Sequence, residues 1–378
     1  MRRNKVKWFF TVLALLIAVI VGRSIPDDGL GDRAMAVGLG IDVTEDGKVE
    51  VCAQILSPSD TSDAGVGTRV VCEEGELLDT AVSKITEVCG GTLTVTHCNV
   101  VLLGEKLAGE EKAFGILRTL LANTYVSDNA YVFVCEGSPK DVLGSSSAFG
   151  QNASEYLQQL ISMYGTYENI TYKTLREIVT ECYRKGNATY MPYLTKRPVD
   201  GKIPPSGSYE EQKEKKDVSY DLNRVLVWKD GVKVGMYGDG ALRAINYLLT
   251  EVHKGSDDFT VPSGKVGVFV LDNRTKKTYD LEKKTFSVEL EIGVTVKDYQ
   301  PHEKKNFGKK PYVLEGEDRV ACETALKNEI ETFYDEMKAK DVDVFGVEQC
   351  FYAKYGKKGD LSFRDVSFDL TVKLKPKT

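Results

Sequence analysis

The chain has little of what metal and redox centres need. Its 378 residues include only three histidines, and no two of them are close in sequence. Its eight cysteines form no Cys-x-x-Cys pair, and their spacing matches no zinc pattern. These absences argue against a histidine-rich metal site, and we expect the protein to use no metal and no cofactor.

The cysteines leave two interpretations open. Cys52, Cys135 and Cys350 lie in apolar or aromatic stretches, where a free thiol packs like a small hydrophobic side chain. Buried free thiols are therefore the favoured interpretation. One or more disulfides are the alternative, because an export segment would allow them to form.

No long basic stripe runs along the chain. The formal net charge is −6 and the isoelectric point is about 5.4. Binding to nucleic acid depends on clustered positive charge, so we expect no nucleic-acid partner. The length suggests two or three domains, and a content of 42% hydrophobic and 28% charged residues is typical of globular proteins.

Long apolar runs are also scarce. Only residues 8–22 approach the length of a membrane span, and basic residues precede them: Arg2, Arg3, Lys5 and Lys7. This arrangement is typical of export and keeps the N-terminus in the cytoplasm. We expect residues 1–23 to be a signal anchor or a signal peptide. The anchor is favoured, with residues 8–22 uncleaved and the bulk of the chain extracytoplasmic.

The remaining pattern mixes strands and helices. Asp46-Gly47 and Asp230-Gly231 each lie between alternating apolar stretches and predict hairpins with turns of about two residues. A long amphipathic helix is predicted over residues 317–339, with one apolar face formed by Val320, Ala325, Leu326, Ile330, Phe333, Tyr334 and Met337. The fold class is therefore α+β (mixed) and multidomain, with antiparallel or mixed sheets, packed helices and a membrane segment in front.

Residues 195–221 break this pattern with prolines, glycines and a charge run. We predict a linker or long loop there. It separates an N-terminal α/β region, residues 31–194, which could hold two subdomains, from a C-terminal domain, residues 222–378.

Each candidate chemical motif also has a purely structural interpretation. Gly38-Leu-Gly40-Ile-Asp42 lacks the third glycine of a dinucleotide loop and precedes a strand, so close backbone packing is expected. His97 lies in a strand-like segment, where a structural histidine bonded to backbone is favoured over a catalytic one. Residues 341–348 place two carboxylates two positions apart, and a turn is favoured over a cation site. We assign no catalytic residue.

Four segments, in this order, resemble the spore germination receptor C-subunit family, Ger(x)C. They are DRAMAVGLGIDVTEDGKVEVCAQIL, THCNVVLLGEKLAGE, RVLVWKDGVKVGMYGDGALRAINYLLT and ETALKNEIETFYDEMKAKDVDVFGVE. The structural motif candidates within them are Gly38, Gly40, Asp42, Gly47, His97, Gly104, Gly231, Gly235, Asp343 and Gly346.

The resemblance implies a non-catalytic subunit of a nutrient germinant receptor, required to trigger spore germination. It implies A and B subunits as partners, a location in the cytoplasmic or inner spore membrane, mixed α/β domains, and neither catalytic residues nor a cofactor. Family members are usually lipoproteins, but here Arg23 stands at the usual position of the lipidated cysteine. We therefore expect no lipidation.

Two functions from other classes are the alternatives. An extracytoplasmic solute-binding protein would need a deep pocket between domains with convergent polar groups. A cell-wall-acting enzyme would need a cleft in which His97 or a pair of carboxylates meets a nucleophile or a metal.

Overall fold

The computed structural model describes Trp8 and residues 33–57, 67–122, 126–147, 151–198, 217–302 and 312–377. The predicted membrane segment, apart from Trp8, and Arg23 lie outside these residues. Within the described part, no helix combines the length and the apolar character that a bilayer crossing requires.

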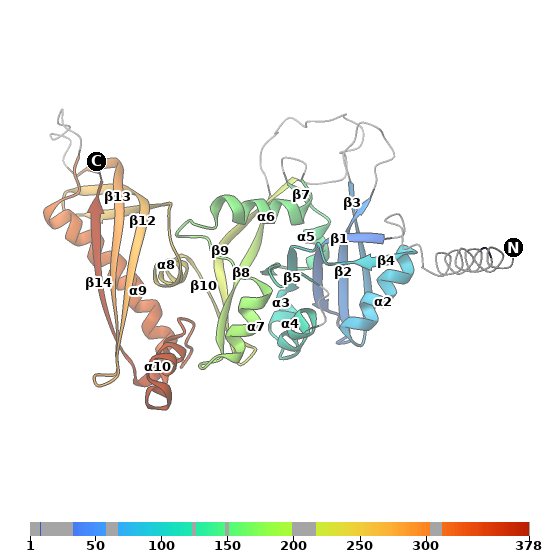
Figure 1. Cartoon of the computed structure of the whole chain (residues 1–378). Helices are drawn as coiled ribbons and strands as arrows, with labels where there is room; N and C mark the ends of the chain where they lie inside the picture. Colours follow the sequence, from blue (N-terminus) through green and yellow to red (C-terminus); the bar gives the residue numbers. More distant parts are fainter. Residues whose placement is uncertain are drawn as a thin grey trace.

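A ten-stranded mixed sheet forms the larger part of the molecule (Figure 1). The strands follow the order β10-β9-β8-β6-β5-β1-β2-β3, with β4 beside β1 and β7 beside β9. The strands at the centre, β1, β5, β6 and β8, pair in parallel, whereas β2-β3 and β9-β10 extend the sheet antiparallel. Their bounds are β1 Arg33–Val43, β2 Val49–Ser57, β3 Gly67–Gly75, β4 Thr92–Thr94, β5 Val100–Gly104, β6 Tyr131–Cys135, β7 Ser146–Ser147, β8 Ala188–Pro198, β9 Asp217–Lys229 and β10 Val232–Tyr237.

Helices cover both faces of this sheet because its central strands are apolar on both sides. All five residues of β5 are buried. One core lies under α2, α3, α4 and α7, and a second lies under α5 and α6 on the other face. The bounds are α2 Leu78–Cys89, α3 Glu105–Ala108, α4 Lys112–Ala122, α5 Pro139–Leu143, α6 Ala153–Tyr164 and α7 Leu175–Tyr183.

The second sheet has four strands in the order β11-β12-β13-β14. A long hairpin joins β12 to β13, and β14 returns parallel to β13. The chain thus has two mixed sheets with packed helices, an α+β fold. The bounds of this part are α8 Asp239–Leu249, β11 Gly255–Val261, β12 Gly264–Asp280, β13 Thr285–Pro301, α9 Gly316–Ala339, α10 Val347–Tyr355 and β14 Ser367–Pro376.

Helix α9 is the predicted long helix, but its buried face differs in part from the prediction. Val320 is 54% exposed and Ala325 is exposed, whereas Cys322 is fully buried. The helix thus turns a narrower stripe toward the sheet, which starts at Cys322 and continues through Leu326 and Ile330. The prediction was wrong for Val320 and Ala325 and did not include Cys322.

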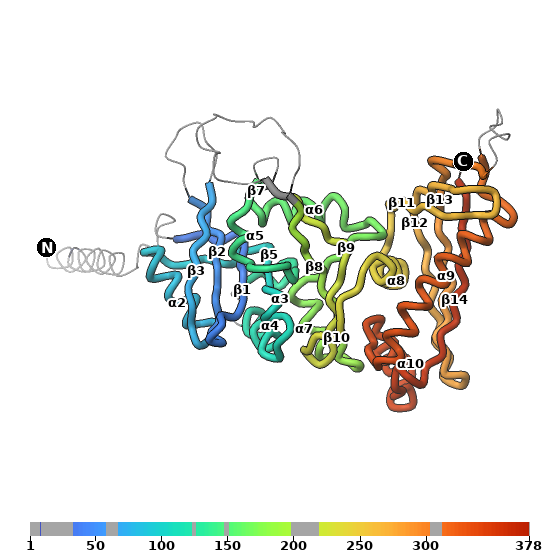
Figure 2. The backbone as a smooth tube through the Cα atoms, turned by 180° about the vertical axis from the view of Figure 1, so that it is seen from behind, coloured from blue at the N-terminus to red at the C-terminus, as the bar shows by residue number. Residues whose placement is uncertain are grey.

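Helix α8 joins the two sheets (Figures 1 and 2). The third core contains α8, α9 and the smaller sheet, and it also contains Ala188, Tyr190, Val225 and Val227 of β8 and β9. The larger sheet therefore supplies one wall of the C-terminal core.

The two predicted turns differ. At Asp230-Gly231 the flanking pair is Lys229 and Val232, and both turn residues have positive φ, 54° and 76°, as a two-residue type I′ turn requires. At Asp46-Gly47 the turn is longer. Thr44 N–H donates to the carbonyl of Lys48 (3.0 Å), and of the turn residues only Gly47 has positive φ. Three residues, 45–47, form this turn, so a single glycine suffices.

The predicted linker, residues 195–221, contains strand at both ends. β8 continues to Pro198, β9 begins at Asp217, and residues 199–216 lie outside the described residues. β9 and β10 belong to the larger sheet, so this sheet continues beyond the segment, and the domain division there stays a prediction. Gly235 lies in β10 at a register shift opposite β9, where a Cβ would lie 2.9 Å from the Tyr237 hydroxyl.

Candidate functional site

The residues singled out in the sequence do not converge on one site. Gly38 and Gly40 lie in β1, directly beneath α5 and the start of α6. A Cβ on Gly38 would lie 2.0 Å from Ser154 Oγ, and one on Gly40 would lie 2.6 Å from Pro139 Cβ. These glycines therefore let the helices approach the strand, and no glycine loop for a phosphate forms here.

Asp42 and Gly104 form a second structural pair, at the ends of β1 and β5. The Asp42 carboxylate accepts hydrogen bonds from the backbone N–H groups of Val43 (2.8 Å) and Leu107 (3.3 Å). A Cβ on Gly104 would lie 2.1 Å from Asp42 Cγ, so only glycine leaves room for the carboxylate. Burial raises the pKa of Asp42. The carboxylate serves the first turn of α3 rather than a reaction.

His97 is not where the sequence suggested. It lies in a turn between β4 and β5 rather than in a strand, and its side chain is exposed. No hydrogen bond from its imidazole to the backbone exists among the described residues. The neighbouring Val100–Gly104 run is strongly apolar, and the strand prediction extended this run three residues too far.

Asp343 and Gly346 lie in the turn between α9 and α10. Asp343 is 1% exposed, and its two carboxylate oxygens accept from the N–H groups of Val347 (2.9 Å) and Glu348 (2.7 Å). Burial raises the pKa of Asp343 to about 6. Because both oxygens are bound to backbone amides at the start of α10, the carboxylate is a helix cap, and the turn interpretation describes it better than a cation site.

Arg184, at the end of α7, connects the N-terminal region to that turn. Its Nη2 donates to the carbonyls of Asp343 (3.4 Å), Val344 (3.1 Å) and Ala188 (3.2 Å). Gly346 has a φ of 69°, and a Cβ there would lie 3.1 Å from Arg184 Nη1. The Asp-x-x-Gly motif is therefore a docking point for a guanidinium from the other part of the chain.

A second polar contact lies nearby, where the loop before α7 meets α8. Asn246 Nδ2 donates to the carbonyls of Tyr167 (3.3 Å), Glu168 (2.8 Å) and Ile170 (2.9 Å). The Glu168 side chain is 2% exposed and accepts from Tyr247 Oη (2.6 Å). Burial, and secondly the charge of Asp257, raises the pKa of Glu168 to about 7.

We call this surface the junction: residues 165–190 on one side, and α8, Ser256 and Asp257 with residues 340–349 on the other. Sequence reasoning found only Asp343 and Gly346 of it. Asn246 had a usable signal, since it interrupts the apolar run of a helix and a polar residue there needs a buried partner. Glu168 and Arg184 lie in polar stretches and had none.

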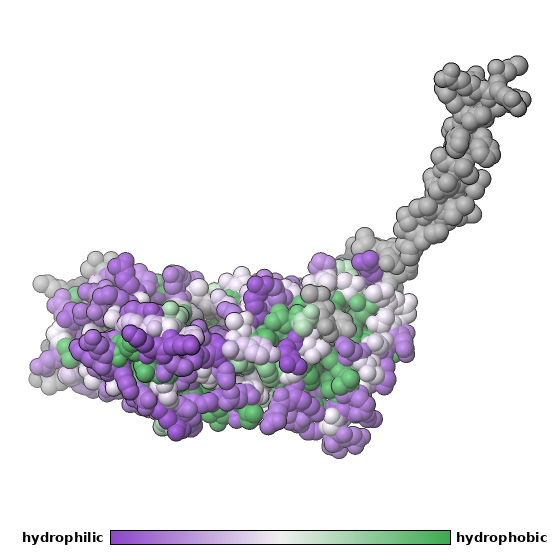
Figure 3. Space-filling view, turned by 60° about the horizontal axis from the view of Figure 1, so that its bottom comes forward, coloured by the Kyte–Doolittle hydropathy of each residue, from purple (hydrophilic) through white to green (hydrophobic). Residues whose placement is uncertain are grey.

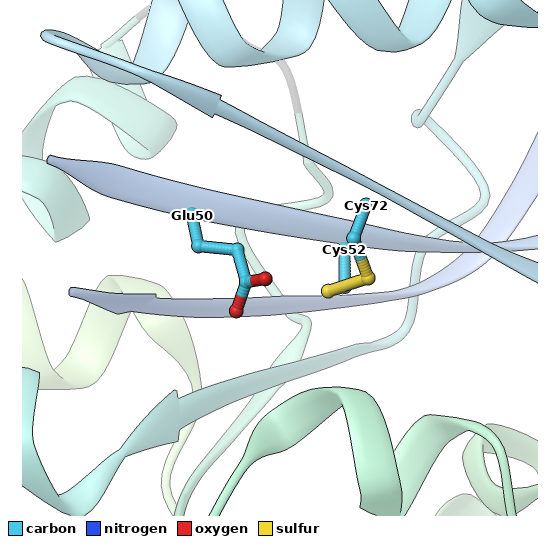
Figure 4. A group of neighbouring side chains, drawn as sticks. All are labelled: Glu50, Cys52 and Cys72. Atoms are coloured by element: carbon cyan, nitrogen blue, oxygen red, sulfur yellow. A yellow bond between two sulfur atoms is a disulfide. The ribbon is translucent and has the colours of Figure 1, made fainter. Parts of the chain in front are cut away.

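One group of possible metal ligands occurs in the described part of the chain, and it lies away from the junction. Atoms of Glu50, Cys52 and Cys72 lie within 4.8 Å of one another on β2 and β3 (Figure 4). Cys52 and Cys72 face each other across the strand pair and form a disulfide. Bonded sulfurs offer no thiolate, so this pair is a covalent link between strands rather than a ligand set.

The disulfide corrects the favoured interpretation of Cys52 as a free thiol. Strand pairing places Cys72 directly opposite Cys52, which the spacing of the sequence did not reveal. Cys135 is buried and free, and Cys350 is free and half-buried.

Comparison with known families gives two matches that follow one another along the chain. Residues 29–196 match the family described as "Spore germination protein N-terminal domain", and residues 223–376 match "Spore germination B3/ GerAC like, C-terminal". Both describe proteins of spore germination. The chain belongs to the spore germination receptor C-subunit family, Ger(x)C.

A solved structure has the same fold. The structure described as "Crystal Structure of the GerBC protein" superposes with a TM-score of 0.54 and 14% identity, over 90% of this chain and 97% of that chain. At this identity the likeness concerns the fold alone. No curated protein matches the chain.

Proposed function

We propose that the chain is the non-catalytic C subunit of a nutrient germinant receptor, acting beside A and B subunits at the inner spore membrane. The observation that supports this most is the collinear match of both regions to germination-family domains. The shared fold with GerBC over nearly the whole of both chains agrees with it.

The hydrogen bonds and positions of the candidate polar residues favour this role over that of a cell-wall-acting enzyme. Catalysis by acids, bases or nucleophiles needs groups that point together into a cleft. Here Asp42 and Asp343 accept from backbone amides, and His97 lies in an exposed turn. The two carboxylates stabilise the fold, which supports a protein that works through its surfaces.

Some of those surfaces are apolar. On the face drawn in Figure 3, hydrophilic residues dominate over the C-terminal half and apolar residues gather over the other half. Leu77 and Val88, at the two ends of α2, are 67% and 61% exposed. Exposed apolar side chains of this size are candidates for contacts with the partner subunits.

We further propose that residues 8–22 anchor the chain without a lipid. Lipid attachment needs a cysteine thiol, and Arg23 has none. In fractionated cells the full-length chain should be in the membrane, without incorporation of labelled fatty acid. A soluble product that begins near Arg23 would show that the segment is a cleaved signal peptide and would remove the anchor from the proposal.

Gene deletion tests the proposed function. In a strain without a redundant receptor, deletion should abolish or slow nutrient-triggered germination and leave spore formation intact. The wild-type gene should restore the response, and so should His97→Ala, because the proposal gives the imidazole no chemical role. A normal nutrient response in the deletion strain would refute the proposal. Failure of well-expressed His97→Ala alone would point to an enzyme.

A further inference from the structure

A cavity of about 270 Å³ opens at the junction. One wall comes from the end of α6, the loop before α7, α7 itself and β8, and the other comes from the last turn of α8. Its charged lining consists of Lys173, Glu177, Glu181 and Arg184, and Tyr172, Tyr190 and Asn246 add polar groups. Both family domains therefore contribute to it.

In the depth of this cavity two cations share one carboxylate, because the second carboxylate of the lining, Glu177, is exposed and accepts from the N–H and Oγ1 of Thr174. The Lys173 side chain is 8% exposed, and its ammonium pairs with the Glu181 carboxylate and lies 4.5 Å from the centre of the Tyr190 ring. Arg184 Nη1 lies 3.4 Å from the same Glu181 oxygen. The other oxygen of Glu181 accepts from Thr189 Oγ1 (2.6 Å). The Glu181 carboxylate is thus the one buried negative group that pairs with both cations.

Two polar groups of the lining indicate which ligand groups the cavity could bind. Arg184 Nε is buried and has no hydrogen-bond partner among the described residues, which is costly for a charged donor. Across the cavity, Asn246 uses its Nδ2 to donate to three carbonyls, which leaves Oδ1 as an acceptor. One wall of the cavity therefore supplies the donors Lys173 and Arg184, and Asn246 on the other wall has an amide oxygen as acceptor.

We propose that the cavity binds a small organic carboxylate that also has a hydroxyl or ammonium group. The carboxylate pairs with Lys173 and Arg184, and the donor group bonds to Asn246 Oδ1. The volume equals that of roughly nine water molecules at ~30 Å³ each, so the ligand is smaller than a typical drug molecule. Because both walls contact it, binding strengthens the junction. This inference does not depend on the proposed receptor role.

Thermal unfolding of the purified full chain tests this directly. The probes are lactate, malate and serine. Propionate and succinate serve as matched carboxylates without the donor group, and inorganic phosphate serves as a plain anion. At least one probe should raise Tm by about 2–4 °C or more, and its matched control should raise Tm less. No shift with any probe, or an equal shift with phosphate, would overturn the proposal.

Three variants locate the binding. Lys173→Met removes the buried ammonium and should weaken binding roughly tenfold or more by calorimetry. Tyr172→Ala removes a rim residue that is 39% exposed, so it should fold even if Lys173→Met does not, and should weaken binding severalfold. Lys185→Met is the control, because its ammonium pairs with Asp360 outside the cavity. Equal affinity in all three would place the ligand elsewhere and overturn the proposal.

Discussion

The two sheets of this chain are covered by different kinds of packing. On the larger sheet, α5 and α6 lie directly on the backbone of β1, because Gly38 and Gly40 have no side chains to hold them away. On the smaller sheet, large rings fill the space under α9. Tyr334 stacks on Phe368 with ring centres 3.9 Å apart and also contacts Phe345 and Phe363.

This difference indicates which change in side-chain volume each part tolerates least. A region packed through glycine tolerates no added atoms, because backbone and helix are already in contact. A region packed through aromatic rings loses most when a ring is removed, because the neighbours cannot close the cavity. We therefore expect added side-chain volume to destabilise the larger sheet most, and removed side-chain volume to destabilise the C-terminal core most.

The largest expected effect is the loss of the Tyr334 ring. Tyr334 is fully buried, so Tyr334→Ala should lower the free energy of unfolding by about 3–5 kcal/mol, measured by denaturant titration. The hydroxyl has no hydrogen-bond partner among the described residues, so Tyr334→Phe should be neutral or stabilising. A Phe variant as unstable as the Ala variant would show that the ring is not what matters.

Added volume in the larger sheet should lower the free energy of unfolding by less than the loss of the Tyr334 ring does, but measurably. Gly40→Val would place a Cβ 2.6 Å from Pro139 Cβ and 3.1 Å from Leu143 Cδ1, and should destabilise by about 1–3 kcal/mol. Gly115→Ala is the matched control. Nothing lies within 4 Å of its Cβ, and in helix α4 it should stabilise by up to ~1 kcal/mol. Equal tolerance of both changes would contradict glycine-mediated packing.

Gly47→Val separates backbone strain from steric contact. Gly47 has a φ of 80°, and no atom lies within 4 Å of the place that a Cβ would take, so the cost arises from the backbone alone. We expect a loss of about 1 kcal/mol, because a β-branched residue is strained at positive φ. An unchanged melting temperature would mean that the turn adopts another conformation.

The last prediction concerns the pH dependence of stability at the junction, where the two regions meet. Burial raises the pKa of Glu168 from 4.5 to about 7. A raised carboxyl pKa stabilises the fold fully below the unfolded value, and this contribution is lost as pH rises through the folded value. The stability of wild type minus that of Glu168→Gln should therefore decrease between pH 4.5 and 7 and then stay level.

Glu282→Gln controls for the loss of one negative charge, since Glu282 is exposed in the β12–β13 connection. If wild type and Glu168→Gln show parallel stability curves across this pH range, the carboxyl of Glu168 does not titrate as its burial implies.

Local patterns predicted much of the fold. The alternation of Phe368, Leu370 and Val372 marks β14, and Asp230-Gly231 marks its hairpin, because each depends only on neighbouring residues. The Cys52–Cys72 disulfide could not be predicted in this way. It depends on the register of β2 with β3, and the sequence alone does not fix that register.

The candidate site was less predictable than the fold. Asp343 and Gly346 were found as a motif, but their partner Arg184 is 159 residues away from Asp343 in sequence. No local pattern links groups so far apart. The same holds for Glu168 and Asn246, which meet only because α8 packs on β8 and β9.

The central claim is that this chain works as a non-catalytic subunit beside A and B partners. Affinity purification of the tagged full-length chain from spore membranes, followed by mass spectrometry, tests it most directly. We predict that an A-type and a B-type receptor subunit co-purify with the chain in constant proportion. Recovery of the chain without either subunit, from spores that germinate normally through the tagged protein, would contradict the account.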